Sequence, residues 1–274
     1  MKRIKLTIAY DGTNYSGWQI QENAPTVEEY VRKALRGLLG DCGAGDCEGV
    51  ELIGASRTDA GVHALGNVAV FDSDVRMPAE KFAYALNARL PEDIRVLQSE
   101  EVSDNFHPRY TKSHKTYVYQ IQNTRIPIPI YSRYMYHIYE DIDINRLSES
   151  VDSFIGEHDF SAFCSAGAQV KSKVRTIESL NVTSEALGTG IRDGLTSESL
   201  TVNEKSGKII RIEVTGNGFL YNMVRIIAGT LIEVGIGRRK PESVAEAIAT
   251  GERSLAGPTA PARGLILKQI RYDT

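Results

Sequence analysis

The chain has 274 residues, of which 42% are hydrophobic and 24% charged, and its formal net charge is −3. This length predicts one large or two medium-sized domains, and the composition is typical of a water-soluble globular protein. No stretch approaches the roughly 18 apolar residues that a membrane span needs, and the N-terminus lacks the features of a secretory signal. We therefore expect a cytoplasmic protein. The slightly acidic total argues against a non-specific nucleic-acid coat protein but is compatible with a local basic surface.

Three cysteines, Cys42, Cys47 and Cys164, are too few for a disulfide framework that pairs them all. Nothing near the Gly-rich stretch between Cys42 and Cys47 supplies the other ligands of a structural zinc site. We expect free thiols and no metal.

The first half has the pattern of a split β-α-β-β-α-β unit. Apolar residues alternate from residue 4 to residue 10, as in a strand with one buried face. Thr26 and Glu29 fit a capping box at a helix start, and Pro78 suits the first turn of another helix. Strands are predicted at 4–10, 50–55, 67–72 and 94–102, and helices at 26–39 and 78–90.

The second half shows the same order of elements. Strands are predicted at 114–123, 176–183, 208–215 and 265–272, and helices at 144–156 and 219–236, with an extra helix from Pro241. Residues 184–207 have the composition of a solvated excursion. We predict an α+β protein of two ferredoxin-like, RRM-like halves, 1–105 and 106–274, forming a mainly antiparallel central sheet.

Residues 55–64, ASRTDAGVHA, connect two predicted strands and have the first chemical pattern. Arg57, Asp59 and His63 stand among small residues, and Gly61 permits backbone conformations that other residues avoid. Such a loop lets a large ligand approach. The alternative is a structural connection in which Asp59 caps local amides.

Arg225 is the only charged residue between Val214 and Ile232, within the predicted helix 219–236. A guanidinium buried without a partner costs several kcal/mol, so a carboxylate from elsewhere should meet it. If that carboxylate is a reactive Asp, Arg225 would keep it ionised. Alternatively, Arg225 extends to the surface.

Tyr117 shares a face of the strand 114–123 with Tyr119 and Ile121 by period-two spacing. Aromatic residues on a strand face usually belong to a core, but such a ring can also stack on a nucleic-acid base. The chain has no P-loop, dinucleotide fingerprint, zinc-protease or serine-hydrolase motif. An Asp-centred site is what remains.

These residues resemble the tRNA pseudouridine synthase A family. The string RTDAGVHA, residues 57–64, is similar to the family's signature loop and is highly specific. Four further segments resemble family patterns in the same order along the chain: YDGTNYSGWQIQ (10–21), KTYVY (115–119), GFLYNMVRIIAGTLIEVG (218–235) and APARGLILKQIRY (260–272). Ser56 stands where the family often has Gly, and the 184–207 excursion is longer than usual.

The resemblance implies the pseudouridine synthase fold and an isomerase that needs no cofactor. It assigns Asp59 as the catalytic residue, Tyr117 as the active-site Tyr that contacts the base, Arg225 as the partner of Asp59, and Arg57 as the residue that helps extrude the nucleotide. The implied substrate is tRNA, at uridines 38, 39 and 40 of the anticodon stem-loop, and the implied assembly is a homodimer.

The residues and the resemblance leave the chemical role of Asp59 and the rival functions open. Asp59 could attack C1′, attack the uracil ring at C6, or remove a C2′ proton. A non-catalytic RNA-binding protein and a glycoside hydrolase are the rival functions, although a hydrolase normally needs a second carboxylate that the loop does not offer. Three basic clusters could bind phosphates: Arg109/Lys112/Lys115, Lys171/Lys173/Arg175 and Arg238/Arg239/Lys240.

Overall fold

The computed structural model describes residues 1–41, 50–167, 170–187 and 207–273. The chain divides into two compact units: unit 1 comprises residues 1–115 and 266–274, and unit 2 comprises residues 116–265. Among the strand pairings whose register is described, five are antiparallel and two are parallel. The predicted α+β class with mainly antiparallel pairing is confirmed.

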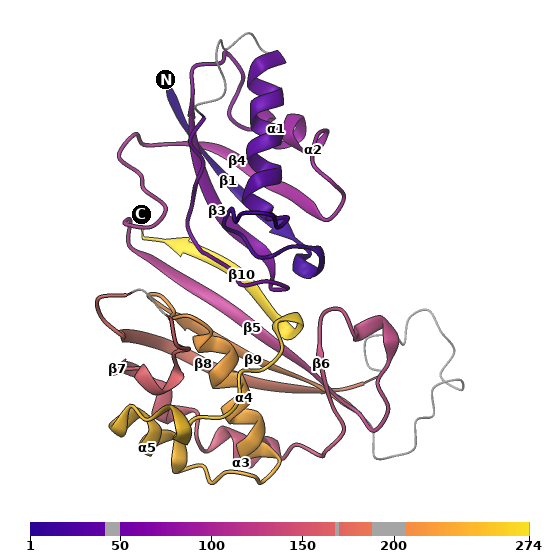
Figure 1. Cartoon of the computed structure of the whole chain (residues 1–274), viewed down its shortest axis with the longest axis vertical. Helices are drawn as coiled ribbons and strands as arrows, with labels where there is room; N and C mark the ends of the chain where they lie inside the picture. The colour runs from indigo at the N-terminus through magenta and orange to yellow at the C-terminus, as the bar shows by residue number, and fades with distance from the viewer. Residues whose placement is uncertain (42–49, 168–169, 188–206, 274) are drawn as a thin grey trace. The chain divides into compact units, whose positions relative to one another are not determined.

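Unit 1 follows the predicted β-α-β-β-α-β order (Figure 1). Its elements are β1 (Lys2–Tyr10), α1 (Val27–Asp41), β2 (Ile53–Gly54), β3 (His63–Ser73), α2 (Lys81–Asn87) and β4 (Ile94–Val102). The strand order is β4-β1-β3-β10, and β2 pairs with β3. The C-terminal strand β10 (Leu265–Tyr272) returns to this unit and runs parallel to β3.

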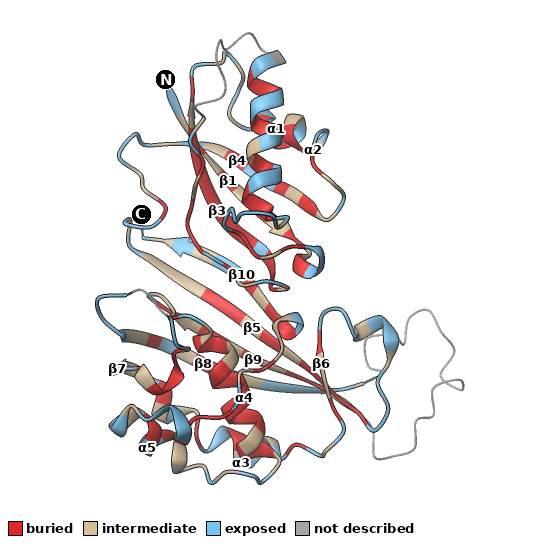
Figure 2. Cartoon of the chain, viewed as in Figure 1, coloured by how far each residue is buried: buried red, intermediate tan, exposed pale blue. Residues whose placement is uncertain are grey.

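The core of unit 1 lies between its sheet and its helices. β1 alternates partly exposed and buried positions, and its inward side chains Ile4, Leu6 and Ile8 are fully buried. On α1, Val31 and Leu35 are also fully buried, and buried residues recur along one side of the helix (Figure 2). Burying each such side chain contributes about 1.5–3 kcal/mol, which explains why the alternation predicted β1 correctly.

The start of α1 was predicted correctly, but its capping box was not. Within the described part of the chain, the buried Thr26 hydroxyl has no hydrogen-bond partner. The first helical N–H groups instead donate to backbone carbonyls: Val27 N to Gly17 O at 3.1 Å and Glu28 N to Trp18 O at 3.0 Å. These bonds satisfy two of the donors at the start of the helix.

Unit 2 contains most of β5 and the elements that follow it (Figure 1). They are β5 (Ser113–Asn123), β6 (Tyr136–Ile138), α3 (Ile144–Ser148), β7 (Gly156–Asp159), β8 (Val174–Ala186), β9 (Lys208–Gly216), α4 (Met223–Gly235) and α5 (Ser243–Thr250). The strand order is β5-β9-β8-β7, and the short β6 runs parallel to β5.

Two predicted elements of unit 2 differ from the structure. The helix expected at 144–156 ends at Ser148, and Gly156, with φ +106°, begins β7. Such a φ is left-handed backbone that a helix cannot contain. The excursion expected from residue 184 begins later, because β8 continues to Ala186 and Leu187 N donates to Gly207 O at 2.7 Å. Residues 188–206, like Cys42 and Cys47, lie outside the described residues.

The helix α4 packs closely against the segment 256–260. A Cβ added at Gly229 would lie 1.9 Å from Pro258 O, and one added at Gly257 would lie 2.7 Å from Thr230 Cα. The Thr230 hydroxyl also accepts a hydrogen bond from Gly257 N at 2.8 Å. Among the helices of the described ranges, none is long and apolar enough to cross a membrane.

Candidate active site

The Asp59 loop connects β2 to β3 in unit 1. Val62 N donates to Asp59 O at 3.1 Å and closes a turn whose third residue, Gly61, has φ +76°. A positive φ at this position favours glycine. Asp59 is half-buried and Arg57 is exposed. The loop therefore holds its carboxylate near the surface on a fixed turn.

Groups outside the loop bind its backbone carbonyls. Four acceptors between residues 54 and 58 receive such hydrogen bonds. Gly54 O accepts from Arg109 Nε at 2.7 Å, Ala55 O from Lys115 Nζ at 3.1 Å, Ser56 O from Asn67 Nδ2 at 3.1 Å, and Thr58 O from Trp18 N at 3.1 Å. Three of the four donors belong to side chains, and two of these, Arg109 and Lys115, are far from the loop in the sequence. Hydrogen bonds to backbone carbonyls thus fix the path of the chain that leads to Asp59.

The segment 10–18, YDGTNYSGW, lies directly against this loop. A Cβ at Gly12 would be 2.0 Å from Val62 O, and a Cβ at Gly17, whose φ is +93°, would be 2.3 Å from Thr58 O. Both positions need glycine for close approach, and Gly17 needs it for its backbone conformation as well. No role for these glycines was predicted from the sequence, although their spacing within YDGTNYSGW was the available signal.

His63 is a buried structural member of the loop. Its Nδ1 lies 3.0 Å from Gly12 N and 3.1 Å from Asp11 Oδ1. One unprotonated nitrogen cannot donate to the carboxylate while it accepts from the amide. We favour acceptance from Gly12, because Thr13 supplies two donors to Asp11 Oδ1, its amide at 3.0 Å and its hydroxyl at 2.5 Å. This contact ties His63 to the segment 10–18.

In unit 2, Arg225 is half-buried on α4 and is held at two nitrogens. Its Nε donates to Ala260 O at 2.8 Å and its Nη1 to Asn222 Oδ1 at 2.7 Å. Asn222 has φ +61° and immediately precedes α4. Asn tolerates this left-handed conformation better than most residues, so it both starts the helix and orients the guanidinium. Asn222 was missed from the sequence, where its place in FLYNMVR was the signal.

Tyr117 and Tyr119 lie on the same face of β5 but have different surroundings. Tyr117 is 6% exposed, and its ring meets Phe219 edge-on with centroids 5.2 Å apart. Tyr119 is fully buried, and its hydroxyl donates to Pro261 O at 2.8 Å. Burial raises the pKa of Tyr119 far above its ordinary value, while the nearby Arg225 and Arg263 oppose that shift. Tyr119 is therefore a core residue close to Arg225.

The predicted site residues thus fall into two groups. Asp59 and Arg57 share one loop of unit 1, whereas Tyr117 and Arg225 belong to β5 and α4 of unit 2. The pairing of Asp59 with Arg225 stays a prediction. Within the described ranges, no group of three His, Cys, Asp or Glu side chains is placed to hold a metal ion.

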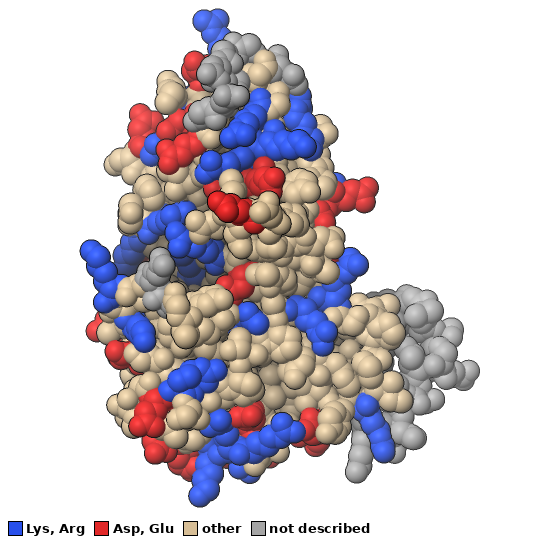
Figure 3. All heavy atoms as spheres, in the orientation of Figure 1, with Lys and Arg blue, Asp and Glu red and all other residues tan. Residues whose placement is uncertain are grey.

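The basic clusters contain many internally paired side chains. Arg109 and Lys115 bind loop carbonyls, Lys112 pairs with Asp273 at 2.7 Å, and Arg239 pairs with Glu233. Lys171, Lys173 and Lys240 are exposed. On the face shown in Figure 3, basic and acidic residues are interspersed. Binding of phosphates by these clusters stays a prediction.

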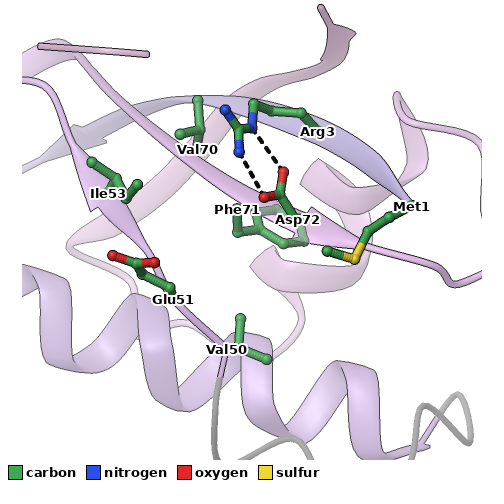
Figure 4. A pocket seen from close by; sticks show the side chains of 8 residues that line it. All are labelled: Met1, Arg3, Val50, Glu51, Ile53, Val70, Phe71 and Asp72. Atoms are coloured by element: carbon green, nitrogen blue, oxygen red, sulfur yellow. Dashed lines mark hydrogen bonds and ion pairs between the residues drawn. The ribbon is translucent and has the colours of Figure 1, made fainter. Parts of the chain in front are cut away.

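A cavity of about 400 Å³ opens in unit 1 away from the Asp59 loop (Figure 4). Arg3 crosses it to Asp72, with Nε to Oδ1 at 2.8 Å and Nη2 to Oδ2 at 2.7 Å. The remaining nitrogen of the guanidinium, Nη1, donates to Asp104 O and Phe106 O. The ion pair holds the pKa of Asp72 below its usual value. Because Arg3 is already fully engaged, we interpret this cavity as structural.

Comparison with known proteins shows the family of the chain. The model for tRNA pseudouridine synthase matches residues 6–111 and 151–273. The protein named tRNA pseudouridine synthase A in Acetivibrio thermocellus is 43% identical over 272 residues, covering 99% of this chain and 100% of its own. Its counterpart in Ruminiclostridium cellulolyticum is 46% identical with the same coverage. In Clostridium tetani, tRNA pseudouridine synthase A 2 is 45% identical over 274 residues and 99% of each chain. The chain belongs to the tRNA pseudouridine synthase family and is an isomerase.

Proposed function

We propose that this protein converts uridines 38, 39 and 40 in the anticodon stem-loop of tRNA to pseudouridine, with Asp59 as the catalytic residue. The observation that carries the proposal is the RTDAGVHA loop, whose approach to Asp59 is fixed by four carbonyl hydrogen bonds. A catalytic group must be held close to its productive geometry, since a displacement of about 1 Å can reduce the rate about 100-fold. The fixed backbone of the loop supports this role for Asp59.

The reaction rearranges atoms that the substrate already contains. The N1–C1′ bond breaks, the uracil turns, and a C5–C1′ bond forms; the proton leaves C5 and N1 is protonated. An ionised Asp59 would act at C1′, at C6 or on the C2′ proton. Arg225 would pair with Asp59 and keep it ionised, because a nearby cation favours the charged form of a carboxyl group.

Tyr117 and Arg57 would act on the target nucleotide itself. A Tyr117 ring already set edge-on against Phe219 has few orientations available, which suits contact with a base. Its hydroxyl would move the C5 proton. Arg57 is exposed and can reach into RNA, where it would occupy the gap left by the flipped nucleotide. We further propose that the enzyme is a cytoplasmic homodimer.

The decisive experiment treats unmodified tRNA with the purified protein and maps pseudouridine chemically at each position. We expect product at 38, 39 and 40 with the wild type, and a loss on the order of 10⁴-fold or more in Asp59→Asn and Asp59→Ala, as when a nucleophile is removed. Asp74→Asn, at an exposed position of the same unit, is the matched control and should keep full activity.

Three results would count against the proposal. Activity retained in Asp59→Asn would remove the catalytic role, and product confined to other uridines would remove the substrate assignment. Release of free uracil without pseudouridine would indicate hydrolysis instead. Binding of tRNA by the Asp59 variants should survive, because the substitution leaves the basic side chains unchanged; a native mass measurement tests the dimer.

A further inference from the structure

A buried chain of three side chains lies behind the Asp59 loop and connects it to the sheet of unit 1. Tyr10 comes from the end of β1, Thr58 from the loop, and Asn67 from β3. Their exposed fractions are 4%, 7% and 0%. Because Thr58 immediately precedes Asp59, whatever fixes Thr58 also fixes the backbone from which the carboxylate projects.

The hydrogen-bond pattern assigns the orientation of Asn67. Its Oδ1 accepts from Val68 N at 2.9 Å, so its Nδ2 faces Ser56 O at 3.1 Å. The second hydrogen of Nδ2 is directed to the Tyr10 hydroxyl oxygen at 3.4 Å, a long bond. The Tyr10 hydroxyl also shares a hydrogen bond of 2.8 Å with Thr58 Oγ1, in which either oxygen can be the donor. Hydrogen bonds therefore connect the three side chains in the order Asn67, Tyr10, Thr58.

Thr58 is held at two points. Its hydroxyl meets Tyr10, and its carbonyl accepts from Trp18 N at 3.1 Å. Gly17 lies against the same carbonyl so closely that a Cβ would reach within 2.3 Å of it. The Thr58 side chain and backbone are thus fixed independently, and water is excluded from both bonds by burial.

We propose that Tyr10, Thr58 and Asn67 are positioning residues for Asp59: through the loop backbone, their hydrogen bonds hold the carboxylate in its productive place. The inference rests on the proposed catalytic role of Asp59. None of the three residues is required to touch the substrate. Their loss should lower the rate of the chemical step and leave tRNA binding nearly unchanged.

Unit 1 offers a matched control for a purely structural role. Asn87, at the end of α2, binds both backbone groups of Val96: its Nδ2 donates to Val96 O at 2.9 Å, and its Oδ1 accepts from Val96 N at 2.8 Å. Asn67 and Asn87 therefore each bind the backbone through both ends of the amide. Only Asn67 connects to the Asp59 loop, so a comparison of the two separates stability from positioning.

The test measures kcat, KM and thermal midpoint on unmodified tRNA for five variants beside the wild type. Thr58→Val keeps the shape of the side chain but removes the hydroxyl, and we expect kcat to fall about 10–100-fold with KM within about threefold. Thr58→Ser restores the hydroxyl and should return kcat to within about threefold of the wild type. Asn67→Ala should lower kcat about 100-fold, and Asn87→Ala should lower the thermal midpoint while kcat stays within about twofold.

Thr58→Val with the same kcat as Thr58→Ser would overturn the inference, as would equal losses of kcat in Asn67→Ala and Asn87→Ala. If Asn67→Ala does not fold, the Thr58 pair decides the question alone. Asp59→Asn, the fifth variant, distinguishes the two proposals. An active Asp59→Asn would defeat the proposed function, whereas an inactive Asp59→Asn beside a fully active Thr58→Val would defeat the positioning role only.

Discussion

The two units hold their candidate catalytic groups in different ways. In unit 1, hydrogen bonds from outside the loop end on the backbone carbonyls that lead to Asp59. In unit 2, the candidate side chain forms the hydrogen bonds itself: the Arg225 guanidinium donates to Ala260 O and to Asn222 Oδ1. A short side chain such as Asp is placed mainly by its backbone. A long one such as Arg, with more rotatable bonds, must also be held near its end.

The difference predicts where harmful substitutions should fall. Positions that support the Asp59 loop lie outside it and act by close approach or by donation to carbonyls, as Gly17 and Asn67 do. Positions that support Arg225 act on its nitrogens directly. Substitutions at positions that support the Asp59 loop should change the local fold around the loop. Substitutions at positions that support Arg225 should change only the orientation of that side chain.

The largest expected effect is at Gly17. Gly17→Ala places a Cβ 2.3 Å from Thr58 O and forces alanine to φ +93°. We expect a loss of about 3 kcal/mol in the free energy of unfolding, from backbone strain and overpacking together. Gly167→Ala is the control, since Gly167 has φ +85° with nothing within 4 Å of the added Cβ. Urea titration should show only the strain there, about 1–2 kcal/mol; equal losses at both positions would contradict the close-approach argument.

Arg225→Lys tests the second half of the comparison. Lysine keeps the charge but cannot present two nitrogens in the planar geometry that reaches both Ala260 O and Asn222 Oδ1. We expect kcat to fall about 100-fold, equivalent to about 2.7 kcal/mol of activation free energy. Arg253→Lys is the control, because Arg253 also donates to backbone carbonyls of unit 2, at Ala256 and Gly257. Similar kcat values for the two variants would show that charge alone matters at 225.

The smallest expected effect is the pH-dependent contribution of the Arg3–Asp72 ion pair of unit 1 to the free energy of unfolding. Arg3 lowers the pKa of Asp72 in the folded state, so the ion pair stabilises the protein above the unfolded pKa of about 4. This contribution is lost as the pH falls through the lower folded pKa. Both side chains are partly exposed, so we expect Asp72→Asn to cost about 0.5–1 kcal/mol at pH 7 and progressively less below pH ~4. A difference that grows on acidification, measured by urea titration, would reverse this sign.

The sequence predicted the elements whose pattern is local. The strands at 94–102 and 265–272 have the predicted bounds. The alternation at 4–10 likewise marks a strand without reference to the rest of the fold. The sequence did not predict the short β6 and β7, which are defined by their pairing with β5 and β8 rather than by any periodicity. Nor did it predict that β10 would run beside β3, since the choice of partner strand depends on tertiary structure.

The same division holds for the candidate site. Asp59, Arg57, Tyr117 and Arg225 could be named from motifs, because each belongs to a specific string of residues. The residues that hold them in place could not be named in this way. Arg109 and Lys115 were predicted from the sequence to bind phosphates, and that role stays a prediction. In the structure they donate to Gly54 O and Ala55 O, acceptors that carry no sequence signal. The capping hydrogen bond predicted for Thr26 is not formed, and backbone carbonyls accept from the first helical N–H groups instead.

The carbonyl hydrogen bonds have a consequence for the tolerance of the loop to sequence change. Ser56 forms its contact with Asn67 through its carbonyl oxygen. Every amino acid has that oxygen, so the residue at 56 can vary during evolution without loss of the bond. Variation is instead restricted at the donor, Asn67, because only a side chain of suitable length and chemistry can reach it.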